Sequence, residues 1–119
     1  MKHHKKTRKF GLETNERRAL LRSLALALIT HGRIQTTEAK AKELRPFIEP
    51  LVTKAKQNTA GTRRYLVSKL GSGAQGLPIK KLVDTIAPKY VTRPGGYTRV
   101  IKTAIRISDG GKMAVIEFV

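Results

Sequence analysis

The apolar residues of this chain change their spacing along its length, from a helical period to a period of two. Leu20, Leu24 and Leu28 fall on one helix face, as residues four apart do. From residue 98 the spacing alternates, which is typical of a half-buried strand. The expected inward rows are Ile101, Thr103, Ile105 and Ile107 in one strand and Ala114, Ile116 and Phe118 in the next. Helices followed by paired strands predict an α+β fold of two layers, with helices on one face of a small three-stranded mixed sheet.

Capping residues indicate where the first helix begins and ends. Thr14 or Asn15 can accept a hydrogen bond from the free amides of its first turn, and Glu16 places a carboxylate near its positive end. Gly32 follows His31 at the position where a left-handed residue would end the helix. We therefore expect a helix from about residue 14 to residue 31.

Turn signals predict the order of the remaining elements. Pro46 and Pro50 lie inside the second helix, where each lacks an amide donor, so we expect a kink or two abutting helices. The expected order is a strand at 33–36, a cap at Thr36 or Thr37, helices at about 38–56 and 62–70, a flexible glycine-rich link at 71–76, a helix that begins at Pro78 and ends at Pro88, and a hairpin that turns at 108–111.

Positive charge dominates the composition. The 119 residues include 25 Lys and Arg but only 8 Asp and Glu, a formal charge of +17. Between Glu49 and Asp109 the only acid is Asp84. So large an excess on one small domain opposes compaction unless an anionic partner neutralises it, and this favours a phosphate-rich partner.

The first 13 residues are expected to form a basic extended arm that is disordered when the protein is alone, because they offer little to bury. Residues 14–119 are expected to form a single α+β domain. The candidate phosphate-binding residues of the arm are Lys2, His3, His4, Lys5, Lys6, Arg8 and Lys9.

Several classes of function lack the residues that they need. The chain has no cysteine, so disulfides, thiolate nucleophiles and cysteine zinc sites are excluded. It contains no helical metal pair of the His-x-x-x-His type, no acid–base pair that could be located, and no apolar run near the ~18 residues of a membrane span. We therefore predict a cytoplasmic protein with no enzyme activity, no cofactor, no metal, no membrane contact and no small-molecule substrate.

The segment from Arg93 to Arg99 concentrates groups that bind phosphate. Gly95 and Gly96 allow backbone amides to approach an anion, and the flanking arginines can each contact two phosphate oxygens. Tyr97 can stack on an exposed base, and the Thr98 hydroxyl adds a donor. A tight turn that only leads into a strand, with Tyr97 at the rim of the core, explains the same residues equally well.

Other basic residues give weaker signals. Arg18 and Arg22 share one helix face, but solvated helical arginines are only slightly less favoured as an interpretation. The remaining candidates for phosphate contact are Arg17, Arg63, Arg64 and Lys102.

Three segments together resemble the bacterial ribosomal large-subunit protein seventeen family. They are the basic start with His3 and Arg8-Lys9, the run Ile34-Gln35-Thr36-Thr37 with Ala41-Lys42-Glu43-Leu44-Arg45 and Glu49-Pro50-Leu51, and Ala87-Pro88-Lys89-Tyr90 with Gly95-Gly96-Tyr97-Thr98-Arg99. The resemblance implies a structural, non-catalytic constituent of the large ribosomal subunit. Its expected partners are large-subunit ribosomal RNA and neighbouring large-subunit ribosomal proteins, near the place where the nascent peptide emerges.

Two other functions remain open from the residues alone. A nucleoid-type architectural protein could place the basic arm in a DNA minor groove. An RNA-modifying enzyme would need an acid–base pair, and the candidates Asp84 and His31 look like a helix-surface residue and a helix-end residue.

Overall fold

The structure is a computed structural model that describes residues 13–74, 76–106 and 108–119. Its helices are α1 (Thr14–His31), α2 (Glu38–Ala55), α3 (Ala60–Leu70) and α4 (Leu77–Lys81), and its strands are β1 (Arg33–Thr37), β2 (Thr98–Lys102) and β3 (Met113–Phe118). After α4 the chain continues through a π-helical turn (Leu82–Ile86) and a 3-10 turn (Ala87–Tyr90). Among the described residues, no helix combines the length and the apolar character that crossing a membrane requires.

The sheet has the order β1-β3-β2, and both of its pairings are antiparallel. The α+β class is therefore confirmed, but the expected mixed sheet is wrong. β1 and β2 run in the same direction, and the C-terminal strand lies between them, so no two parallel strands are neighbours. The sequence order of the strands does not reveal which of them is central.

The register shows which strand residues face the helices. Ala114 and Ile116 are fully buried and Phe118 packs against the core, which confirms the inward row predicted for β3. Val100 pairs with Ile116, so Val100 lies on the inner face of β2.

The inward row predicted for β2 is wrong by one residue. Ile101 is 43% exposed because its partner in the register is Val115, on the opposite face from Ile116. Ile105 is 61% exposed, beyond the end of the strand at Lys102. Residue 107, also placed in that row, lies outside the described residues.

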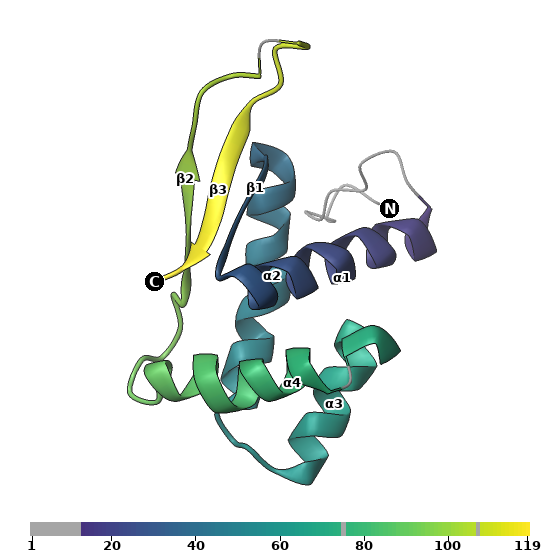
Figure 1. Cartoon of the computed structure of the whole chain (residues 1–119), viewed down its shortest axis with the longest axis vertical. Coiled ribbons are helices and arrows are strands. Elements are labelled where there is room, and N and C mark those ends of the chain that lie inside the picture. The colour runs from purple at the N-terminus through teal and green to yellow at the C-terminus, as the bar shows by residue number, and fades with distance from the viewer. Residues whose placement is uncertain (1–12, 75, 107) are drawn as a thin grey trace, which may run out of the picture.

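Helix α2 is the centre of the packing. It contacts all three strands, as well as α1 and α3; in Figure 1, α1 lies beside β1, and α3 and α4 lie beyond the lower end of the strands. Its buried residues include Leu44, Ile48 and Val52, and these join one core with Leu28 of α1 and Leu66 of α3. This arrangement confirms a helical layer on one face of the sheet.

Pro46 and Pro50 do not divide α2 into two helices. Both prolines lie on the exposed side of the helix, whereas the residues around them bury the opposite side. The carbonyl groups that lose an amide partner belong to Lys42 and Pro46, which are both exposed residues, so the cost is small beside the apolar burial of the inner face.

Local signals located most helix ends within two residues. Thr37 caps α2 through a 3.3 Å hydrogen bond from the Lys40 amide, and Gly32 ends α1 with φ of 79°. The residue at the N-cap of α1 is Glu13, not Thr14 or Asn15, and no side chain caps that end.

The second half of the helical layer departs further from the predictions. The capping hydroxyl of Thr59 lets α3 begin at Ala60, two residues early. Ala74 in the glycine-rich link is fully buried, within a 3-10 turn, and is therefore part of the packed domain. Helical turns continue past Pro88 to Tyr90, because proline fits the first turn of the 3-10 segment.

Candidate nucleic-acid interface

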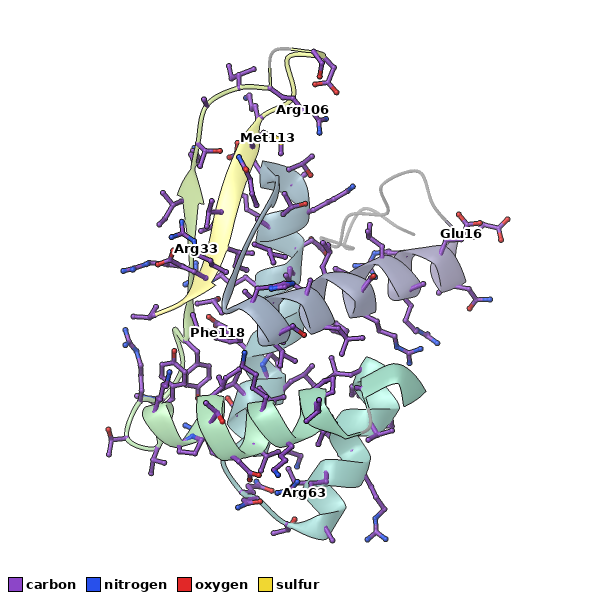
Figure 2. The ribbon with its side chains drawn as sticks, in the orientation of Figure 1. Glu16, Arg33, Arg63, Arg106, Met113 and Phe118 are labelled. Atoms are coloured by element: carbon purple, nitrogen blue, oxygen red, sulfur yellow. The ribbon has the colours of Figure 1, made fainter. Side chains whose placement is uncertain are left out.

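Acidic side chains of the described residues are mostly engaged with basic ones. The carboxylate–cation pairs are Glu38 with Lys42 and Lys102, Glu43 with Arg17, Glu49 with Arg45, Asp84 with Arg63, Asp109 with Arg106, and Glu117 with Arg33 and Arg99. The few acids are thus distributed widely over the surface, and Arg106 and Arg63 lie at opposite ends of the molecule (Figure 2). The cations that have no acidic partner can bind an external anion without breaking an internal ion pair.

The Arg93–Arg99 segment is held in place by the protein's own polar groups. Gly95 and Gly96 have φ of 124° and 64°, values that favour glycine. The Lys56 ammonium donates to the carbonyl oxygens of Tyr90 at 3.2 Å and Arg93 at 2.9 Å, and so fixes the start of the loop. The side chain of Arg93 is exposed and has no acidic partner within the part of the chain that the structure describes.

Tyr97 lies in the core, with only 1% of its surface exposed. Its hydroxyl is 3.0 Å from the Thr53 hydroxyl, its ring packs 5.2 Å from the Tyr90 ring, and Lys56 lies over it. Burial acts to raise the pKa of Tyr97, but the nearby Lys56 ammonium and Thr53 hydroxyl outweigh it and leave the pKa lowered. A base cannot stack on this ring, so the structure favours the turn-and-core interpretation for Tyr97.

Thr98 is also used inside the fold. Its amide and its hydroxyl both donate to Oε2 of Glu49, at 3.1 and 2.8 Å, and the residue is 2% exposed. Its hydroxyl is therefore not available as a phosphate donor. Tyr97 and Thr98 position the glycine pair, and the groups left facing outward are the loop backbone and Arg93.

Arg99 is exposed but already paired. Its Nη2 and Nε atoms lie 2.5 and 2.8 Å from Oε2 of Glu117, and Arg33 lies 3.7 Å from the other carboxylate oxygen. Lys102 is similarly 3.5 Å from Glu38. Both could contact RNA only while sharing their charge, Arg99 with Glu117 of β3 and Lys102 with Glu38 of α2.

The helical arginines fall into two groups. Arg22 donates to the carbonyl oxygens of Ser68 and Lys69, at 3.2 and 3.0 Å, and so closes the C-terminal end of α3. Arg17 and Arg63 are partly buried and bind Glu43 and Asp84. Arg18 and Arg64 are exposed, with no hydrogen bond or ion pair among the described residues. The expected ridge of Arg18 and Arg22 is thus reduced to Arg18.

The candidates of the basic arm, Lys2, His3, His4, Lys5, Lys6, Arg8 and Lys9, lie outside the described residues. Among the described residues, no three His, Asp or Glu side chains gather where a metal ion could be held.

One feature of this surface was not anticipated from the sequence. Tyr65 of α3 is 36% exposed, with the ammonium groups of Lys54 and Lys69 at 5.4 and 5.7 Å from the centre of its ring. A groove beside it brings together α2, α3 and the glycine loop at Gly95. The Tyr65–Lys69 pair is visible as an i,i+4 spacing, but Lys54 and Gly95 come from distant parts of the chain.

A model of the family described as ribosomal protein L17 matches residues 20–119. The chain belongs to this family. The match covers every described helix and strand beyond the first turns of α1, and it confirms the resemblance suggested by the sequence motifs.

Curated members of the family match over the full length of the chain. The chain is 49% identical to the large ribosomal subunit protein bL17 of Nautilia profundicola, over 100% of this chain and 98% of that protein. It is 47% identical to the protein of the same name from Thermomicrobium roseum, over 100% and 99%, and 46% identical to that from Rickettsia bellii, over 100% and 82%.

Proposed function

We propose that this protein binds large-subunit ribosomal RNA through phosphate contacts from unpaired surface cations, the glycine loop and the basic arm. As a member of the ribosomal protein L17 family, it is a structural constituent of the large ribosomal subunit and not an enzyme. It therefore works in the ribosome, beside the RNA and the other proteins of that subunit. What the protein contributes is a charged surface of fixed shape.

The observation that carries the RNA proposal is the position of the unmatched charge. Lys54, Lys69 and Arg64 lie on α2 and α3, Arg93 lies in the loop, and none of them has an acidic partner among the described residues. Phosphate oxygens are the counterions that ribosomal RNA offers in excess. Binding at this surface breaks no internal ion pair, which keeps the cost of RNA contact there low.

The remaining candidates are proposed in graded roles. The cations Lys54, Arg64 and Lys69 form the α2–α3 surface. The arm and Arg18 would add phosphate contacts outside this surface. Arg99 and Lys102 would contribute while still sharing Glu117 and Glu38. Gly95 and Gly96 would offer backbone amides, with Tyr97 and Thr98 holding them in place from within.

A salt titration tests this proposal. The full chain is mixed with a transcript of large-subunit ribosomal RNA, and the affinity is measured between 50 and 200 mM salt. If about eight phosphates are neutralised, the affinity should fall by several thousand-fold over that range. An affinity independent of salt would contradict the proposal.

Duplex DNA at matched salt serves as the competitor. Family membership favours RNA over the architectural DNA-binding alternative, so structured RNA should win this competition. In cell extracts the protein should sediment with large subunits and leave them only in concentrated salt. Equal competition by DNA, together with absence from the subunit fraction, would overturn the RNA assignment.

A further inference from the structure

The groove beside Tyr65 has the dimensions and the lining of a ligand site. Its volume is about 650 Å³, within the ~300–1,000 Å³ typical of small-ligand pockets. It is open to solvent on one side. The lining residues are Pro46, Glu49, Pro50, Thr53, Lys54, Tyr65, Gly95 and Tyr97.

Tyr65 is the one tyrosine of the three whose ring is open to a ligand. Tyr90 and Tyr97 are 4% and 1% exposed, whereas Tyr65 is 36% exposed. No hydrogen bond of its hydroxyl is present among the described residues, so the side chain has no internal polar role comparable with that of Tyr97. An aromatic ring at a basic surface suits stacking with a nucleic-acid base.

The charges around the ring are those that a nucleotide requires. Lys54 and Lys69 approach the ring from two different helices. The only acid in the groove lining, Glu49, already accepts two hydrogen bonds from Thr98 and lies 3.5 Å from Arg45. The site therefore offers cations without a competing free carboxylate, which favours an anionic ligand over a basic peptide.

We propose that this groove holds an unpaired nucleotide of ribosomal RNA, with its base stacked on Tyr65 and its phosphates bound by Lys54 and Lys69. This inference rests on the proposed RNA binding and adds a specific recognition element to it. Both lysines now lie over the ring, and their flexible side chains can turn to the phosphates as the base takes their place. Pro46 and Pro50 form an apolar wall that can pack against the sugar.

Two substitutions at Tyr65 separate stacking from other effects. Tyr65→Leu keeps apolar bulk and removes the aromatic ring, so binding to the large-subunit transcript should weaken about 5- to 100-fold. The salt dependence should not change, because no phosphate contact is lost. Tyr65→Phe keeps the ring and should bind within about twofold of the wild type. The matched charge controls are Lys54→Gln, which should lower the salt slope by ~0.7–0.9, and Lys42→Gln, a lysine outside the groove that is paired with Glu38, which should lower it less.

Tyrosine fluorescence supplies a second test that does not depend on the stability of the leucine variant. The chain has no tryptophan and three tyrosines, so Tyr65 contributes directly to the emission. Addition of the transcript should quench the emission of the wild type. In Tyr65→Phe most of this quenching should disappear although the RNA still binds.

The outcomes distinguish this inference from the proposed function. If the wild type shows no salt-sensitive RNA binding, the proposed function fails. If the wild type binds and Tyr65→Leu, with an unchanged melting temperature, binds equally well, only the nucleotide site is overturned. If the transcript quenches the tyrosine emission of Tyr65→Phe as strongly as that of the wild type, the proposed stacking on Tyr65 is overturned.

Discussion

The arginines of the sheet and its hairpin and the lysines beside Tyr65 differ in whether an acid pairs with them. On the sheet and its hairpin, Arg33, Arg99 and Arg106 are each within 4 Å of a carboxylate. On the α2–α3 surface, Lys54 and Lys69 face an aromatic ring and no acid. The comparison shows that net charge alone does not locate a phosphate-binding surface. The position of the few acids decides where the excess of cations can be used.

The tyrosines show the same contrast. Tyr97 lies within the basic segment Arg93–Arg99, yet it is buried and hydrogen-bonded inside the protein. Tyr65 lies in α3, outside that segment, and its ring is accessible to solvent. A motif rich in arginine and glycine thus contains a structural tyrosine, whereas the accessible one lies elsewhere.

The largest expected effect is on stability, at Tyr97. Tyr97→Ala should lower the free energy of unfolding by about 3–5 kcal/mol, because it leaves a cavity and removes the partner of the Thr53 hydroxyl. Tyr65→Ala, at an exposed position, should change it by less than about 1 kcal/mol. Denaturant unfolding of both variants measures the difference, and equal losses would remove the distinction between the two tyrosines.

The next effect is on RNA affinity and compares two triple variants of equal charge change. Replacing Lys54, Arg64 and Lys69 by Gln should weaken binding about 100-fold at 0.1 M salt, since each lost phosphate contact costs about fivefold. The control replaces three acid-paired cations, Lys42, Arg33 and Arg106, by Gln. It should lose clearly less affinity and a smaller part of the salt slope. Equal losses in the two triple variants would mean that pairing with an acid does not decide which cations bind.

A smaller effect is expected at Arg99. Arg99→Ala should cost about 1 kcal/mol of RNA affinity, at the lower end of the ~1–3 kcal/mol of a full arginine contact, because Glu117 already shares the guanidinium. The surface ion pair itself contributes at most about 1 kcal/mol to folding, so the melting temperature should fall only slightly. Binding titrations and thermal unfolding together check this. A loss of several kcal/mol in affinity would place Arg99 among the principal RNA contacts.

The smallest effect concerns how the stability contributed by the Arg106–Asp109 ion pair of the hairpin depends on pH. Hydrogen bonds from Arg106 hold the pKa of Asp109 below its ordinary value of 3.8. A carboxyl group with a pKa lowered by folding stabilises the protein at neutral pH, and this contribution is lost as the pH falls through the folded-state pKa. The wild type should therefore melt slightly above Asp109→Asn at pH 7, and the difference should vanish well below pH 3.8. A difference that persists in acid would show that the charge of Asp109 is not its cause.

The sequence by itself determined the parts that depend on neighbouring residues. The helical period, the glycine after His31 and the capping threonine at residue 37 located α1 and α2, because these signals act within one turn of a helix. The alternation in 114–118 identified the buried row of β3. The excess of Lys and Arg indicated a polyanionic partner, because net charge is independent of the fold.

Tertiary structure alone decided the features that join distant segments. The inner face of β2 follows from pairing Val100 with Ile116, and Thr98 can be buried because Glu49, in another element, satisfies its donors. The same holds for part of the basic surface, because Asp84 and Glu117 pair with arginines that are distant in the sequence. A local pattern can show that a residue is basic or aromatic, but its availability depends on which partners the folded chain brings within hydrogen-bonding distance.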